Sequence, residues 1–268
     1  MKSSTALSLV CVAASLIGAN IHAQTKASDK LYSARALYYT PTTQGLRSFH
    51  CALVIDWKDL LARFSGTDIQ EDNPFLKYLQ TAHLSVTDDL KSGGQLDWAN
   101  TAVPPEGKEG PAAKMKEGMQ KMITSFFQTW NGYMSGKMVP APDDSTTVTE
   151  VNGTIQLHAK AANMDVTESF DKNMLLTEAH VVTPSIDATA YPTYVDTSDG
   201  RVVSIIRTVY RQPPTAPPAE GTFTVSYAMV SNFRLPETLS VNAKNIGAFV
   251  FKFSGCSVET AEKAAGKL

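Results

Sequence analysis

The sequence is poor in cysteine and lacks the short motifs that mark the common enzyme classes. Three cysteines occur among 268 residues, and no two of them have Cys-x-x-Cys spacing. No Gly-x-Ser-x-Gly, His-Glu-x-x-His or glycine-rich phosphate loop is present. These absences favour a non-catalytic protein, for which no cofactor and no metal are expected.

Dense runs of one charge are also missing. The chain has 24 Lys and Arg against 26 Asp and Glu, a formal net charge of −2. Surfaces that bind nucleic acid are usually strongly basic, so no nucleic-acid partner is expected. Hydrophobic residues make up 43% and charged residues 19%, which is an ordinary composition for a folded globular chain.

One apolar run, residues 6–19, stands near the start, and no later run is long enough to cross a membrane. It follows Lys2 and is followed by a small residue at Ala23, as in a secretory signal peptide. A membrane anchor is the alternative, but the run is short and lacks charges on its far side. We therefore expect residues 1–23 to be a signal peptide and residues 24–268 a single exported domain. The expected location is the periplasm of a bacterium or the extracellular space, with no transmembrane segment in the mature chain.

Export would change the number of cysteines, because cleavage of the signal peptide removes Cys11. An oxidising compartment and an even remaining count predict a disulfide between Cys51 and Cys256, with two buried free thiols as the alternative. The bond would tie the first mature strand to the last. Cys256 is out of phase with Phe253, so a bulge at Gly255 is needed to turn its thiol inward.

Residues 221–258 alternate between apolar and polar side chains more regularly than any other stretch. A period of two predicts antiparallel strands with one buried face. Asn152-Gly153 and Ser198-Asp199-Gly200 have the composition of hairpin turns, so an antiparallel sheet is expected over residues 146–258.

Proline and glycine predict an internal linker at residues 99–112, and the apolar spacing predicts a long helix over residues 113–136. Short helices are expected earlier in the chain, one beginning after Asp56 and ending at Gly66, another beginning at Pro74. The expected fold class is α+β. It is a curved antiparallel meander that resembles half of a barrel, with one long and two or three short helices packed on one face.

The long helix carries a stripe of methionine and aromatic side chains. Such a stripe is most often core, but methionine also gives adaptable surfaces that suit apolar ligands of variable shape. If a ligand lies between helix and sheet, the helix residues and the facing strand residues that would contact it are Met119, Met122, Phe126, Phe127, Trp130, Phe233, Leu235 and Leu239.

One pattern in the last third resembles a known family. Asp199-Gly200, followed by Tyr227-x-x-Val230-x-x-Phe233-x-Leu235-Pro236-x-x-Leu239-x-Val241, resembles the closing strands of the LolA-like superfamily of periplasmic lipoprotein carriers and related exported lipid-binding proteins. The resemblance implies an incomplete barrel closed by helices over a hydrophobic cavity that holds acyl chains. It does not extend to residues 57–137, and it identifies no ligand-contact residue.

Three functions follow from these observations. The first is a non-enzymatic exported protein that binds a lipid or other apolar ligand between sheet and helix. The alternative is a structural or protein-interaction module with a filled core and no ligand, which meets a protein partner through an exposed edge or the proline-rich residues 212–221. The third is an enzyme of unrecognised type, which would need a carboxylate beside His83 or His180 in a cleft.

Overall fold

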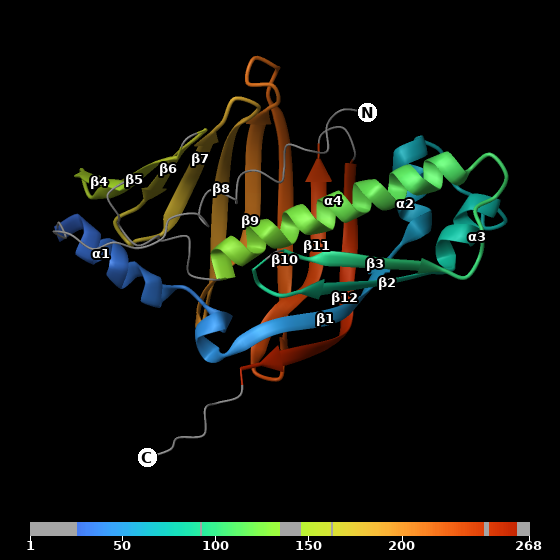
Figure 1. The fold of residues 1–268 in the computed structure, drawn as a ribbon, viewed down its shortest axis with the longest axis horizontal. Helices are drawn as coiled ribbons and strands as arrows, with labels where there is room; N and C mark the ends of the chain where they lie inside the picture. Colours follow the sequence, from blue (N-terminus) through green and yellow to red (C-terminus); the bar gives the residue numbers. More distant parts are fainter. Residues whose placement is uncertain (1–25, 92, 135–145, 162, 244–246, 262–268) are drawn as a thin grey trace.

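The structure is a computed structural model that describes residues 26–91, 93–134, 146–161, 163–243 and 247–261. Within these ranges it has the predicted α+β architecture, one curved sheet with helices (Figure 1). The expected signal peptide at residues 1–23 and the expected helix end at residues 135–136 lie outside the described residues.

Twelve strands form a single antiparallel sheet in the order β3-β2-β1-β12-β11-β10-β9-β8-β7-β6-β5-β4. From β4 to β12 each strand pairs with the next one in sequence, so the predicted meander is confirmed. The strands are β1 Leu46–Ile55, β2 Ala82–Asp88, β3 Gln95–Asn100, β4 Thr146–Val151, β5 Thr154–Ala161, β6 Met164–Phe170, β7 Leu176–Val182, β8 Asp187–Thr197, β9 Gly200–Arg211, β10 Ala219–Val230, β11 Phe233–Ala243 and β12 Gly247–Thr260.

The helices are α1 Lys26–Ala34, α2 Trp57–Ser65, α3 Pro74–Gln80 and α4 Glu109–Met134, with short 3₁₀ turns η3 Arg35–Leu37 and η4 Pro41–Gln44. Local chemistry sets the ends of α2, because the Asp56 side chain accepts a hydrogen bond from the Asp59 N–H and Gly66 closes the helix in the left-handed conformation. Asn73 caps α3 in the same way, and Pro74 occupies its first position.

Two predicted boundaries were wrong. Helix α4 begins at Glu109, not at residue 113, and β3 continues to Asn100, so the predicted linker at residues 99–112 shortens to residues 101–108. Pro111 had suggested irregular backbone, but in the first turn of a helix a proline removes no intrahelical hydrogen bond. The sheet also reaches beyond residues 146–258, since it includes β1, β2 and β3.

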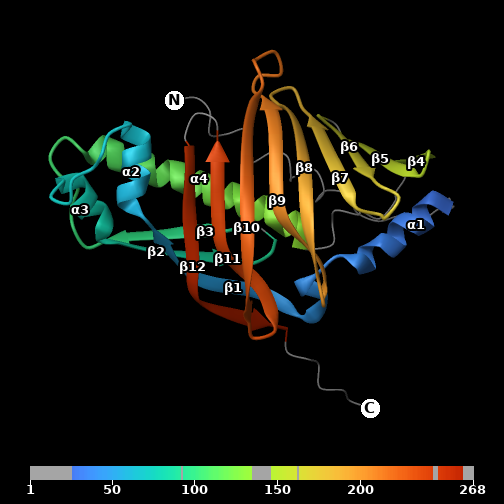
Figure 2. The ribbon, with the colours of Figure 1, turned by 180° about the vertical axis from the view of Figure 1, so that it is seen from behind.

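Helix α4 runs across one face of the sheet, in front of the long strands in Figure 1 and behind them in Figure 2. The sheet curls at its β1–β3 end, which brings β3 alongside α4, while α2 and α3 sit beside the same end. The main hydrophobic core therefore lies between α4 and the inner face of the curved sheet.

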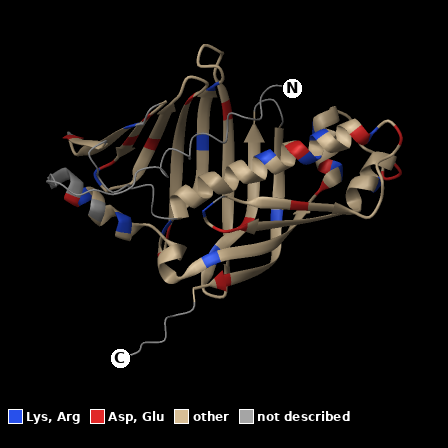
Figure 3. Ribbon diagram, viewed as in Figure 1, with Lys and Arg blue, Asp and Glu red and all other residues tan. Residues whose placement is uncertain are grey.

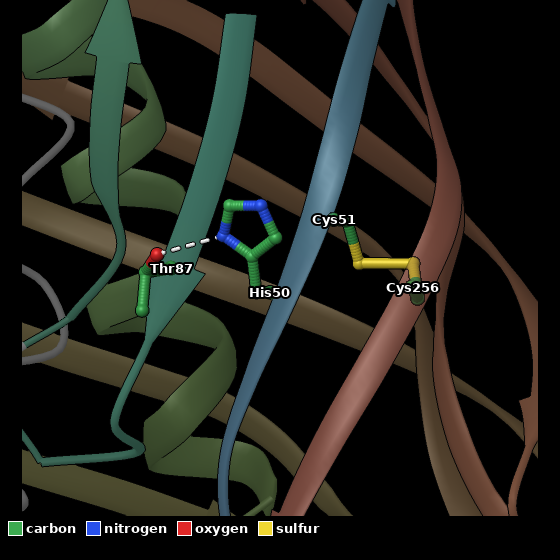
Figure 4. The surroundings of a disulfide bond; sticks show 4 residues. All are labelled: His50, Cys51, Thr87 and Cys256. Atoms are coloured by element: carbon green, nitrogen blue, oxygen red, sulfur yellow. Dashed lines mark hydrogen bonds between the residues drawn. A yellow bond between two sulfur atoms is a disulfide. The ribbon is translucent and has the colours of Figure 1, made fainter.

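The disulfide between Cys51 and Cys256 joins β1 to β12 (Figure 4), as predicted. Cys51 has no exposed surface and lies on the buried face of β1, between Phe49 and Leu53. The pairing of the strands slips between His50 and Ala52, because Gly255 adds a residue to β12 with a φ of 57°. This bulge turns Cys256 toward Cys51, so the predicted phase shift is confirmed.

Candidate functional site: the interface between helix α4 and the sheet

The last three turns of α4 are buried on nearly every side. Residues 122–134 contain no charged side chain, and Figure 3 shows the charges of α4 confined to its first half. Phe126, Phe127 and Trp130 have no exposed surface. An uncharged helix segment that is buried around most of its circumference must be covered on nearly all sides, and the curved sheet provides most of that cover.

Aromatic rings fill the layer between this segment and the sheet. The ring of Phe127 lies 5.6 Å from Phe49 on β1 and 5.8 Å from Phe253 on β12. Phe126 contacts Phe223 on β10 at 5.8 Å, and Trp130 contacts Phe49 at 5.8 Å. Most of these pairs are edge-to-face, the geometry that aromatic quadrupoles favour. The interface therefore spans the sheet from β1 to β10.

A short hydrogen-bonded chain fixes Trp130 within this apolar layer. Its indole N–H donates to the hydroxyl of Tyr227 at 3.1 Å, and that hydroxyl donates to the carbonyl of Val203 at 2.5 Å. Burial raises the pKa of Tyr227, which keeps the hydroxyl protonated and able to donate. Because both polar groups are satisfied, they carry little desolvation penalty.

The turn between β2 and β3 packs against the other side of α4. The hydroxyl of Thr124 donates to the carbonyl of Gly94 at 2.9 Å. A Cβ atom at Gly94 would lie 2.4 Å from the Phe127 ring, so only glycine permits this approach. The amide of Asn131 donates to Oδ1 of Asp88 at 2.9 Å, and Asp88 is fully buried. The turn and α4 are therefore joined by backbone proximity and by buried polar contacts.

Asp88 is an unusual group to bury, because one of its oxygens lacks a partner. Oδ1 also accepts from the Leu90 N–H at 2.9 Å, whereas Oδ2 of Asp88 and Oδ1 of Asn131 have no hydrogen-bond partner. Burial raises the pKa of Asp88 to about 7, although the bonds from Asn131 and Leu90 oppose the rise. The group therefore changes charge near neutral pH.

A second buried carboxyl, Glu168, lies on β6. Its side chain is on the buried parity of the strand, with Val166 and Phe170, and its Oε2 has no hydrogen-bond partner. Burial raises the pKa of Glu168 to about 8, so the neutral acid is the main form at neutral pH. The isolated carboxyl is stable in this position only because it holds its proton.

Tyr194 on β8 carries another buried hydroxyl without a hydrogen-bond partner. Its ring packs edge-on against Tyr38 at 5.4 Å and Tyr133 of α4 at 6.2 Å. Burial raises the pKa of Tyr194 well above its usual value, and the neighbouring Tyr133, Tyr38 and Glu168 add to the rise. The Tyr194 hydroxyl and the Glu168 carboxyl are therefore mainly uncharged at neutral pH.

All eight predicted ligand-contact residues lie in or against the core. Seven are buried, with exposed fractions from 0% to 6%, and Met122 is half-buried. Ring contacts place Phe126, Phe127 and Trp130 directly on the sheet. Leu239 pairs with Val225 on the face that contacts α4. Their role in ligand binding stays a prediction.

The sequence analysis missed Asp88, Asn131, Glu168 and Tyr194. A signal existed for the two carboxyls, because each occupies the apolar parity of its strand, Asp88 after Leu84 and Val86 and Glu168 between Val166 and Phe170. A charged residue at a buried strand position is a departure from the pattern.

His180 lies beside a carboxylate, that of Asp187. His180 Nε2 lies 2.9 Å from Oδ1 of Asp187, and Arg211 reaches the other oxygen at 3.1 Å. His180 and Arg211 lower the pKa of Asp187, as in an ordinary surface ion pair. The His180 side chain is 38% exposed, and no hydroxyl or thiol hydrogen-bonds to it within the described part of the chain. The carboxylate that the enzyme hypothesis requires beside His180 is therefore present.

The His50 ring lies on the exposed side of β1 and is hydrogen-bonded to the hydroxyl of Thr87 (Figure 4). Among the residues that the structure describes, no group of His, Cys, Asp or Glu has the geometry to hold a metal ion. No described helix is both long and apolar enough to span a membrane.

Comparison with known proteins gave no further guide to function. No family model, curated protein or solved structure matches the chain. The resemblance of the last third to the LolA-like superfamily therefore stays a hypothesis.

Proposed function

We propose that this protein binds a lipid or another apolar ligand between the inner face of the sheet and helix α4. The main observation is that one long, uncharged helical segment covers the apolar inner face of a curved sheet. Buried oxygens without partners, at Glu168, Tyr194 and Asp88, lie in the same core.

The rings of Phe126, Phe127 and Trp130 fill the layer between helix and sheet, so binding requires α4 to move. The free energy for this movement comes from burying the ligand's own apolar surface. The end of α4 is held by its aromatic contacts with the sheet and by polar bonds from Asn131 to Asp88 and from Thr124 to Gly94. These bonds can exchange without breaking the sheet.

A ligand in this interface must approach Trp130. The chain has three tryptophans, so replacing Trp57 and Trp98 by Phe leaves Trp130 as the single reporter. A fatty acid with a brominated chain should then quench Trp130 emission in a saturable titration. As a control, Trp130→Phe in the same chain removes the last tryptophan, so tryptophan emission and its quenching should both be absent. Saturable binding that leaves Trp130 unquenched would place the ligand elsewhere.

A matched pair of substitutions tests the site itself. Phe126→Asp buries a charge in the interface and should abolish uptake of a fluorescent fatty acid or unfold the chain. Phe64→Asp, on an α2 side chain that is 55% exposed, should leave both folding and uptake unchanged. Native mass spectrometry of the purified full chain, followed by lipid extraction, would identify an acyl-bearing species that co-purifies.

One observation favours the alternative function, a structural or interaction module. Three core rings of α4 have no exposed surface, as in a core that needs no ligand. A native mass spectrum that shows the protein without a bound ligand, together with no uptake of the fluorescent fatty acid, would support this alternative.

We also propose that the protein is exported. The bond between Cys51 and Cys256 supports this, because structural disulfides persist in oxidising compartments. Thiol labelling of cell fractions should find the protein outside the cytoplasm with both cysteines blocked.

A further inference from the structure

The inner face of the sheet carries a row of small side chains that ends at Glu168. Through successive pairing, Glu168 lies beside Ala179, Ala179 beside Ala190, Ala190 beside Thr208, and Thr208 beside Gly221. We call Ala179, Ala190, Thr208 and Gly221 the small-residue row. All four are buried, and directly paired residues of neighbouring strands share a face.

This row faces α4. Gly221 is two residues before Phe223, whose ring contacts Phe126 of the helix, and alternate residues of a strand share a face. Larger side chains flank the row along the strands, Ile206 on β9 and Phe223 on β10 beyond Thr208 and Gly221. The row therefore consists of short side chains, with a carboxyl at one end.

The buried carboxyl of Glu168 at the end of this row is unfavourable for the stability of the protein. Its side chain is buried, and Oε2 makes no hydrogen bond. An unsatisfied buried polar group costs about 1–3 kcal/mol, and a leucine of similar size would avoid that cost. A buried group that weakens the free protein is often one that serves a bound partner.

We propose that the small-residue row binds the hydrocarbon chain of an amphiphile. Glu168 at the end of the row donates a hydrogen bond to the uncharged head of that amphiphile, the carbonyl oxygen of a carboxylic acid or ester. This assignment rests on the proposed function, since it names the ligand class for the same interface. A protonated carboxyl offers one O–H donor, and a carbonyl oxygen accepts it. Oε2 of Glu168 thereby gains the partner that it lacks.

The same chemistry rejects ionised heads. Among the described residues no charged side chain influences Glu168, because burial alone accounts for its raised pKa. A phosphate dianion would enter an apolar region without a counter-charge, which is strongly unfavourable. An ester or a protonated acid brings no charge and fits the site.

The test measures competition with a fluorescent fatty-acid ester, which carries no charge, by two probes of equal chain length, a fatty-acid methyl ester and the corresponding alkane. The wild-type chain should bind the ester about 10-fold more tightly than the alkane, the effect of one hydrogen bond in a dry site. Glu168→Leu should fold at least as well as the wild type and bind both probes equally. Glu168→Gln retains a donor and should keep the preference for the ester.

Glu178→Gln is the matched control, because Glu178 lies on β7 beside Ala179 but points to the opposite face of the sheet. It should leave both affinities unchanged. Equal ester affinity in Glu168→Leu and wild type would overturn the assignment while leaving apolar binding intact. An alkyl phosphate that binds more tightly than the ester would overturn it as well. If the wild type binds neither probe, the proposed function fails together with this inference.

Discussion

Asn131 on α4 donates a hydrogen bond of 2.9 Å to Asp88, the last residue of β2. This contact links two segments that are 43 residues apart, and both side chains are buried. Each retains one oxygen without a partner, so the pair is held by a single direct bond. The contact is therefore both specific and sensitive to substitution.

Replacing Asn131 by Ala should lower the free energy of unfolding by about 1–3 kcal/mol, because it removes a donor from a buried carboxyl. Urea unfolding followed by circular dichroism would measure the loss. The exposed residue Lys114, on the same helix, provides the control, and Lys114→Ala should change stability by less than about 0.5 kcal/mol. Equal stability of the two variants would show that the buried bond contributes nothing.

Stability should fall as pH rises from mildly acid to mildly alkaline values. Burial raises the folded-state pKa of Asp88 to about 7 and that of Glu168 to about 8, from ordinary values of 3.8 and 4.5. Between the ordinary and folded values, the folded chain holds a proton that the unfolded chain has lost. Each group then lowers stability by up to about 1.4 kcal/mol per pH unit, and the loss is complete once pH exceeds the folded pKa.

Glu168→Gln separates the two contributions, because it fixes that side chain in an uncharged form. Its stability, measured by denaturant unfolding at several pH values, should decline less steeply than that of the wild type between about pH 4.5 and 8. Glu178→Gln, on the opposite face, should keep the wild-type slope. Parallel curves for all three proteins would exclude a raised pKa at Glu168.

Removing the disulfide should be costly because it closes a long loop. Cys51 and Cys256 are 205 residues apart, and the chain-entropy model assigns such a bond about 5 kcal/mol as an upper value. Reduction, or replacement of both cysteines by Ala, should lower the urea midpoint markedly. The double variant should show no further response to reductant, which separates the bond from other effects of the reagent.

Gly200 should tolerate no side chain. Its φ is +116°, and an added Cβ atom would lie 2.8 Å from the Tyr39 nitrogen and 2.9 Å from the Tyr38 carbonyl carbon. Gly200→Ala should destabilise the chain by about 1–3 kcal/mol or more, since both the backbone and its neighbour must shift. Gly153→Ala provides the comparison, because Gly153 also has a positive φ, of +79°, but has nothing within 4 Å of the added atom. Thermal unfolding should show a larger loss at Gly200.

Much of the local structure could be predicted from the sequence, because short-range chemistry determines it. Asp56 and Gly66 set the ends of α2 through their own side-chain and backbone preferences, and Asn152-Gly153 forms the turn between β4 and β5. The alternation of apolar and polar residues predicted the strands in the last third of the chain. The phase of Cys256 relative to Phe253 even required the bulge at Gly255 that the structure contains. Pro111 misled the prediction because a first-turn proline resembles a breaker.

Only the tertiary structure decided which distant residues meet. The pairing of β1 with β12, the approach of the β2–β3 turn to α4, and the burial of Glu168 depend on register and sheet curvature. No short window of sequence contains that information, since each contact joins segments that are far apart in the chain. The sequence alone determined that α4 has an apolar stripe and that the strands have one buried face. The curl of the sheet around the helix turned these separate surfaces into one interface, because that arrangement removes the most apolar area from water.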